Sequence, residues 1–137
     1  VIFKKYSPMG EMGAVSAELA EAMARTAGMS CAICDRDAVI AAAGGAKKDI
    51  LERSISSELE QLMERRECYE RGVDEQPEVL ISSQDGCAVV AAAPIITDGD
   101  VSGCVAFVSE KEDEKADEVL LKLCQSAAQF LSKRIAV

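Results

Sequence analysis

Uncharged apolar runs recur along this 137-residue chain and predict the strands of a β-sheet. Polar, turn-prone residues separate several of these runs, at Asp35–Asp37, Asp85–Gly86 and Asp98–Gly99. Because short turns of this kind join antiparallel strands, the pattern predicts an antiparallel sheet. The hairpin at 30–44 is expected in the middle of that sheet, since its strands carry no charge on either face. The five expected strands are 31–34, 39–43, 79–81, 87–96 and 101–108.

Two long segments near the ends of the chain carry apolar residues at helical spacing. The first is expected to begin at Ser7–Pro8, an N-cap serine followed by a proline at the first helical position, and to end at Gly28. The second covers 113–135, with acidic residues at its start and Lys133–Arg134 at its end, as the helix dipole favours. Both are expected to pack against the sheet.

Two shorter helical segments are predicted between the strands. Residues 47–51 are expected to form a helical turn, and Ser57 with Glu60 forms a capping-box pattern that opens a helix. A sheet of neighbouring antiparallel strands with helices at both chain ends defines an α+β fold.

Each terminal helix carries an apolar stripe for which two interpretations remain open. The stripe packs on the chain's own sheet, or it also forms a seam with a second subunit. The first stripe is rich in alanine, which lets a partner helix approach closely. The side chains predicted for an oligomer interface are Met12, Val15, Leu19, Met23, Leu120, Leu123, Ala127 and Phe130.

Composition and charge restrict the possible functions. Apolar residues make up 49% of the chain and aromatic residues 4%, which predicts a core of small side chains. A net charge of −9 repels phosphate backbones, so this chain alone is not expected to bind nucleic acid. No run is long and apolar enough for a membrane span, and no signal peptide is evident, so a cytoplasmic location is expected. The chain begins at Val1 inside an apolar run, which suggests a fragment of a longer protein.

The six cysteines are predicted to be small buried thiols, because most of them lie inside the apolar runs. Cys31 and Cys34 have the spacing of a metal or redox motif, but a strand would point them to opposite faces. The chain contains no histidine, which excludes Ser-His-Asp and Cys-His catalysis within it. No metal and no enzymatic activity are therefore expected.

The segment Gly44-Gly45-Ala46-Lys47-Lys48 is the first candidate for ligand binding. Glycines let a ligand approach the backbone, and lysines can neutralise an anion. The P-loop spacing is absent. The alternative interpretation is a turn followed by a solvated, cationic helix start.

Several segments spread over nearly the whole length resemble the C-terminal part of the stage V sporulation protein T family of transcription regulators. They are VIFKKYSP at 1–8, CDRD at 34–37, G-x-x-K-K-D at 44–49, Ser54–Ser56, PIITDGDVSG at 94–103, and Ala127, Ala128, Phe130 and Leu131 in the last helix. The resemblance implies a GAF domain, related to PAS domains, with an antiparallel five-stranded sheet flanked by helices.

The resemblance also implies how the chain would work. Residues 1–6 would be the tail of an upstream AbrB-like swapped-hairpin DNA-binding domain, and 7–137 would form the GAF-like sensor. DNA would be contacted through the upstream domain alone, and the terminal helices would form bundles in a homodimer or homotetramer. No cyclic-nucleotide or tetrapyrrole motif is present, so no cofactor is expected, and the small-molecule effector is unidentified.

The resemblance thus implies a small-molecule sensor that regulates transcription during sporulation. The ligand is expected between the sheet and residues 44–56. Polar contacts are predicted from Asp35, Gly45, Lys47, Lys48, Ser54 and Ser56, and the pocket lining from Ile33, Ala41 and Ile95. The alternative is a structural oligomerisation module whose pocket is vestigial and holds no ligand.

Overall fold

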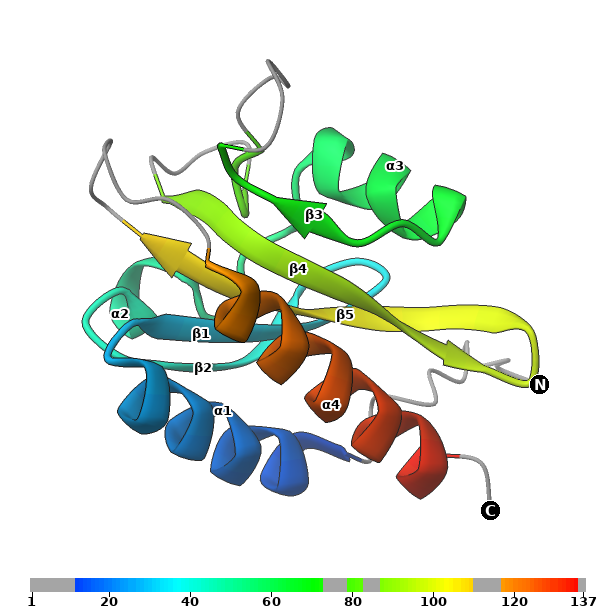
Figure 1. Ribbon diagram of the computed structural model, residues 1–137, viewed down its shortest axis with the longest axis horizontal. Helices are drawn as coiled ribbons and strands as arrows, with labels where there is room; N and C mark the ends of the chain where they lie inside the picture. The colour runs from blue at the N-terminus through cyan, green and yellow to red at the C-terminus, as the bar shows by residue number, and fades with distance from the viewer. Residues whose placement is uncertain (1–11, 73–78, 83–86, 110–116, 136–137) are drawn as a thin grey trace, which may run out of the picture.

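A five-stranded antiparallel sheet lies between two layers of helices (Figure 1). The computed structural model describes residues 12–72, 79–82, 87–109 and 117–135. The strands are β1 (Ser30–Asp35), β2 (Val39–Ala43), β3 (Tyr69–Glu70), β4 (Ala88–Thr97) and β5 (Asp100–Ser109). They lie in the order β2-β1-β5-β4-β3. The helices are α1 (Gly13–Ala27), α2 (Lys47–Ile50), α3 (Ser57–Arg65) and α4 (Glu118–Ile135).

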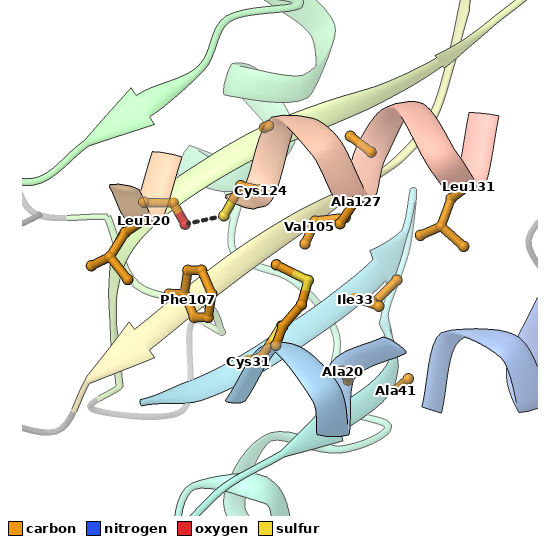
Figure 2. Close-up of a cluster of buried hydrophobic side chains, with 14 of the residues drawn as sticks. Ala20, Cys31, Ile33, Ala41, Val105, Phe107, Leu120, Cys124, Ala127 and Leu131 are labelled. Carbon is orange, nitrogen blue, oxygen red and sulfur yellow. Dashed lines mark hydrogen bonds between the residues drawn. The ribbon is translucent and has the colours of Figure 1, made fainter. Parts of the chain in front are cut away.

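The α1 and α4 helices cover one face of the sheet, and α2 and α3 pack on the other (Figure 1). On the α1/α4 face, Phe107 and Ile33 from the sheet meet Cys124 and Leu131 of α4 (Figure 2). On the α2/α3 face the sheet contributes mainly alanine, valine and cysteine. The predicted α+β fold with a core of small side chains is confirmed.

Two of the predicted turns set the strand pairing. Asp35 Oδ1 accepts hydrogen bonds from the backbone N–H groups of Asp37 and Ala38, over 2.7 and 2.8 Å, and so closes the β1–β2 turn. Between β4 and β5, Asp98 and Gly99 both have positive φ values, 52° and 85°, as a two-residue hairpin turn requires. Asp85–Gly86 and the predicted helix start at Ser7–Pro8 lie outside the described residues. Gly28 ends α1 in the left-handed conformation, as predicted.

The β1–β2 hairpin lies at the edge of the sheet and not in its middle, because β2 is the outermost strand. The open edge of β2 is covered by the segment that follows α2. Glu52 donates its backbone N–H to the Val39 carbonyl, and Val39 donates to the Arg53 carbonyl, each over 2.9 Å. This irregular segment pairs the outer hydrogen-bonding groups of Val39 and so covers the start of the β2 edge.

The fifth strand is not the predicted Val79–Ile81. Leu80 makes an isolated bridge to Ala88, and the edge position next to β4 is taken by Tyr69 and Glu70 of β3. Tyr69 is buried, but charged residues on both sides conceal it in the sequence. A two-residue strand of this composition produces no apolar run.

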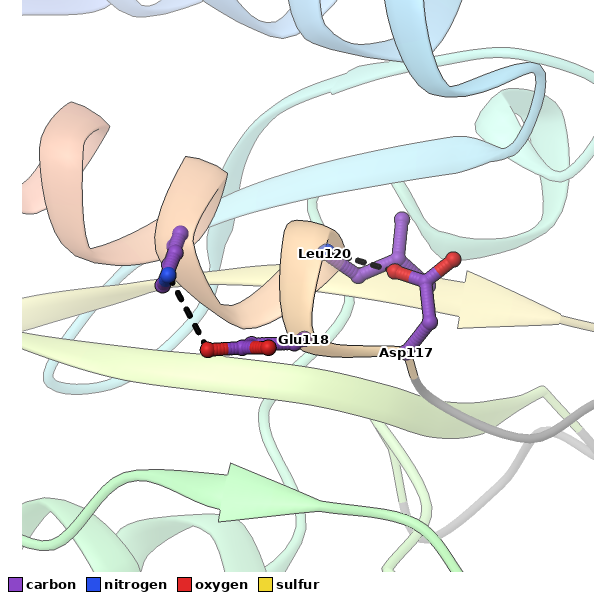
Figure 3. A network of polar contacts seen from close by, with 4 residues as sticks. Asp117, Glu118 and Leu120 are labelled. Carbon is purple, nitrogen blue, oxygen red and sulfur yellow. Dashed lines mark hydrogen bonds and ion pairs between the residues drawn. The ribbon is translucent and has the colours of Figure 1, made fainter.

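The α4 helix begins with an acidic cap (Figure 3). Asp117 Oδ1 accepts the backbone N–H of Leu120 over 2.9 Å. Glu118 forms an exposed ion pair with Lys122 over 3.0 Å, one helical turn along, which adds little stability. The predicted segment 113–116 lies outside the described residues, so the acidic start is confirmed at 117–118.

The α3 helix is capped one residue earlier than the capping-box pattern predicts. Ser56, which is buried, accepts the backbone N–H of Leu59 with its Oγ over 3.1 Å. The same hydroxyl donates to the Leu80 carbonyl over 2.6 Å. Ser57 is the first helical residue and is exposed. Ser56 therefore joins the start of α3 to the segment that precedes β4.

Replacing Ser56 by alanine is expected to lower the free energy of unfolding by about 2 kcal/mol, because both the cap and the buried partner of Leu80 are lost. Chemical denaturation measures this change. The matched variant Ser57→Ala, one residue along, should change stability by less than about 0.5 kcal/mol. The reverse order of the two effects would show that Ser57 is the cap.

Among the residues that the structure describes, no helix has the length and apolar character needed to span a membrane.

Candidate functional site

The residues predicted to bind a ligand do not come together at one site. Ile33, Ala41 and Ile95 lie in the core under α1 and α4. The 44–56 segment, with α2, packs on the opposite face. The predicted lining is therefore wrong for a pocket beside residues 44–56, because alternate residues of a strand point to opposite faces. In β1 and β2 it is Ala32 and Ala42 that face α2 and α3.

Two of the predicted polar contacts are engaged in local structure. Asp35 closes the β1–β2 turn, and Ser56 caps α3. Ser54 pairs with Ala38 in an isolated bridge beside β2. These contacts are formed within the protein and need no ligand. A role of Asp35, Ser54 and Ser56 in ligand binding stays a prediction.

The glycine–lysine segment forms an exposed corner next to α1. Gly45, Lys47 and Lys48 are exposed. Ala46, which follows Gly45, donates its backbone N–H to Ser30 Oγ over 3.0 Å. A shallow hollow of about 450 Å³ beside this corner is lined by Gly45, Ser30 and Arg25. The two lysines are not among its lining residues, so the structure does not unite the predicted cationic and glycine contacts.

The space between the sheet and α2/α3 is filled by side chains. Ile50 of α2 and Leu59 and Met63 of α3 are at most 3% exposed. They pack against alanine, valine and cysteine side chains of the sheet. Within the described residues, the predicted pocket region is thus part of the hydrophobic core.

Five of the six cysteines are buried, as predicted for small apolar side chains, while Cys68 is exposed. Cys34 lies opposite Cys104 in the β1–β5 pair. A hydrogen bond with Cys104, together with burial, raises the pKa of the Cys34 thiol. Burial also raises the pKa of Cys31, to about 12, and that of Cys124. These thiols are therefore protonated and unreactive at neutral pH.

No group of His, Cys, Asp or Glu in the described parts of the chain is arranged to hold a metal ion.

The predicted interface residues differ in how much of each remains available to a partner. Met23, Leu120 and Ala127 are buried in the chain's own core. Phe130 is 44% exposed. The remaining predicted residues are half-buried against the α1/α4 core: Met12, Val15, Leu19 and Leu123. A partner can therefore contact part of the predicted set, and the interface itself stays a prediction.

The sequence reasoning missed one cluster of charged side chains. Arg36, Arg66 and Asp100 line a hollow beside α3, although they are far apart in the sequence. The available signal was topological. In an antiparallel β1–β5 pair, the β1–β2 and β4–β5 turns must lie at the same end of the sheet.

The fold is that of GAF domains. The GAF domain of phosphoenolpyruvate-protein phosphotransferase from Acinetobacter matches 96% of this chain and 84% of its own, with a TM-score of 0.65 at 12% identity. The cofactor-binding GAF domain of the nutrient sensor CodY from Clostridium difficile matches 87% and 83%, with a TM-score of 0.63 at 14% identity. Type II free methionine-R-sulfoxide reductase from Thermoplasma acidophilum matches 90% and 94%, with a TM-score of 0.60 at 12% identity. At these identities the likeness shows the fold alone.

Sequence similarity is more specific. Residues 11–136 match the family model described as stage V sporulation protein T C-terminal, transcription factor. Stage V sporulation protein T of Bacillus subtilis (strain 168) is 36% identical over 135 residues, which span 98% of this chain and 75% of the relative. This chain belongs to the stage V sporulation protein T C-terminal family. It is a GAF-fold domain of a transcription factor family linked to sporulation. The upstream boundary predicted at residues 1–6 lies outside the described residues and stays a prediction.

Proposed function

We propose that this chain is the effector-sensing domain of a cytoplasmic sporulation regulator, and that α1 and α4 pass the signal to an upstream DNA-binding domain. The observation that carries the proposal is the common placement of α1 and α4 on one sheet face. After packing their own core, both helices retain half-buried apolar residues, and Phe130 is still more exposed. A second subunit that packs on these residues would couple the two sensors.

Ligand binding would act by favouring one packing of the terminal helices over another. The CodY neighbour, a cofactor-binding GAF domain, supports a ligand-binding use of this fold. Since the chain has a net charge of −9, contact with DNA would fall to the upstream domain. A catalytic role is not proposed, although one structural neighbour is a reductase.

The filled α2/α3 face favours a second candidate function. Ile50, Leu59 and Met63 occupy the region where a GAF sensor was expected to hold its ligand. In this alternative, the domain is a structural oligomerisation module without an effector. The two candidates differ in whether any small molecule stabilises the folded chain.

A thermal-shift screen with amino acids, nucleotides and other polar metabolites tests the sensor function. A ligand at one hundred times its Kd adds about 2.7 kcal/mol to the free energy of unfolding, which corresponds to roughly 8 °C in Tm. We expect at least one such shift, accompanied by a change in oligomer mass or shape in light scattering. No shift across the whole library, with an oligomer of constant mass, would leave the structural alternative.

The role of the terminal helices is tested by measuring the oligomer mass of the variant Phe130→Asp in light scattering. A charge at this exposed position should weaken subunit association and lower the oligomer mass, because it places a carboxylate in an apolar contact. Gln129→Asp, at an exposed neighbouring position on α4, serves as the control and should leave the mass unchanged. An unchanged mass in both variants would remove Phe130 from the interface.

A further inference from the structure

A hollow of about 190 Å³ lies at the end of the sheet where the β1–β2 turn, α3 and the β4–β5 turn meet. Its apolar part is formed by Met63 of α3, which is 3% exposed, and by the half-buried Val101 of β5. Charged side chains from all three segments complete the lining: Arg36, Glu60, Glu64, Arg66 and Asp100. The hollow thus combines a small apolar surface with charges of both signs.

Local structure holds each segment in place around this hollow. The two hydrogen bonds to Asp35 fix the turn that carries Arg36. At the end of α3, Arg66 adopts a left-handed conformation and donates from Nη2 to the Gly99 carbonyl over 2.6 Å. This bond joins the helix to the β4–β5 turn. The walls of the hollow are therefore connected by the fold and do not depend on a ligand.

Most of the charged groups around the hollow lack a protein partner. Within the described residues, Arg36, Glu60, Glu64 and Asp100 form no ion pair or side-chain hydrogen bond. Oppositely charged side chains that line one hollow without pairing leave their hydrogen-bonding capacity to solvent or to a ligand. A ligand that carries both charges would engage both sets at once.

The size and chemistry of the lining favour a small, charged organic ligand. The three carboxylates are not arranged to hold a metal ion, as established above for the described residues. The volume of about 190 Å³ is smaller than the roughly 300–1,000 Å³ of pockets for drug-sized molecules, which favours a ligand smaller than a nucleotide. Arginine binds carboxylates in a bidentate manner, and carboxylates accept hydrogen bonds from ammonium groups.

We infer that this hollow, called the Arg36 hollow from here on, binds a small zwitterionic amino acid. The ligand's carboxylate would contact Arg36 and Arg66, and its ammonium group would contact Glu60, Glu64 or Asp100. A short apolar side chain would pack against Met63 and Val101. The inference rests on the proposed sensor function and assigns a ligand class to it. The bound molecule would bridge the β1–β2 turn, α3 and the β4–β5 turn. It would stabilise the sheet end to which Arg66 already ties α3.

The test uses L-norvaline and its two single-charge analogues, butylamine and pentanoate, titrated into the 137-residue chain. Calorimetry gives the affinity, and amide NMR shifts locate the site. We expect norvaline to shift the signals of Arg36 and Asp100, and each analogue to bind at least about tenfold more weakly, since each loses one set of charge-assisted hydrogen bonds. Equal affinity of an analogue, or shifts confined to other parts of the chain, would overturn the inference.

Variants separate specific binding from general charge effects. Arg36→Gln removes an exposed arginine of the hollow and should weaken norvaline binding at least about tenfold without changing Tm. Arg65→Gln removes an exposed arginine of α3 that does not line the hollow and should bind norvaline normally. Equal affinities for both variants and the parent chain would refute the assignment.

The outcomes also distinguish this site from the broader proposal. If norvaline and other amino acids fail to bind while a different metabolite raises Tm, the hollow is refuted and the sensor function stands. If norvaline binds and Arg36→Gln abolishes binding while the oligomer never responds, the site stands and the coupling through α1 and α4 is refuted.

Discussion

Gly103→Ala is expected to lower the free energy of unfolding by about 3–5 kcal/mol, and Tm by roughly 10–15 °C. Gly103 lies in β5, opposite Asp35 of β1 and Ile95 of β4. A Cβ atom at this position would overlap the backbone carbonyl of Cys34. The overlap is with the backbone, so no side-chain rotation relieves it.

The cost arises because β5 is the central strand of the sheet. To accommodate the methyl group, β1 and β5 would have to separate next to the β1–β2 turn. Separation would break ladder hydrogen bonds and open the buried contacts around Cys34 and Cys104, both of which are fully buried. A loss of this size is a large fraction of the 5–15 kcal/mol that stabilises a typical domain.

Gly45→Ala provides the control for Gly103→Ala. A Cβ atom at Gly45 meets nothing within 4 Å, so this change should alter stability by less than about 0.5 kcal/mol. Denaturant unfolding and thermal melting measure both variants. Similar stability of the two variants would mean that β1 and β5 can shift apart at little cost, contrary to the close approach described here.

Local turn chemistry made much of the sheet predictable. Asp98–Gly99 predicted a hairpin because few other residues adopt positive φ at successive positions, and Asp35 predicted a turn because its carboxylate bonds to nearby backbone N–H groups. The strand at Tyr69–Glu70 was not predictable in this way. Its pairing depends on β4, which is distant in sequence, and not on any local apolar run.

The candidate site was harder to predict because it depends on the faces of the sheet. Fully apolar strands give no alternation, so Ile33 and Ala32 are equally plausible on either face. The prediction that Ile33 lies beside residues 44–56 was therefore a choice between the two faces of the sheet, which the sequence does not distinguish. The Arg36 hollow needs three distant segments to meet: the strand order brings the two turns together, and α3, which no strand order places, completes the hollow.

Raising the pH above about 9 is expected to destabilise the chain steeply through its buried thiols. Burial, with a smaller effect of Cys104, raises the pKa of Cys31 from 9.0 to about 12. Hydrogen bonding with Cys104 and burial raise that of Cys34, and burial raises that of Cys124. Above pH 9 the unfolded chain releases these protons while the folded chain keeps them. The unfolded state then binds fewer protons, so stability falls as pH rises.

Each retained proton contributes about 1.4 kcal/mol per pH unit, so Cys31 and Cys124 together give a slope of about 3 kcal/mol per unit between pH 9 and pH 11, and Cys34 acts in the same direction. Below pH 9 their contribution to stability is fully present. Urea denaturation under reducing conditions at several pH values measures the slope. Because other groups titrate in the same range, the informative quantity is the difference in slope between variants.

Removing two of the buried thiols, in Cys31→Ala/Cys124→Ala, should reduce that slope by about 3 kcal/mol per unit, even though the alanines also lower stability at neutral pH. Cys68→Ala removes the exposed thiol and should leave the slope as it is in the parent chain. The same slope in all three proteins would show that the core thiols ionise as readily in the folded state as in the unfolded one. The core under α1 and α4 would then admit water, and the close packing of Cys31 of β1 and Cys124 of α4 between the sheet and these helices would not hold.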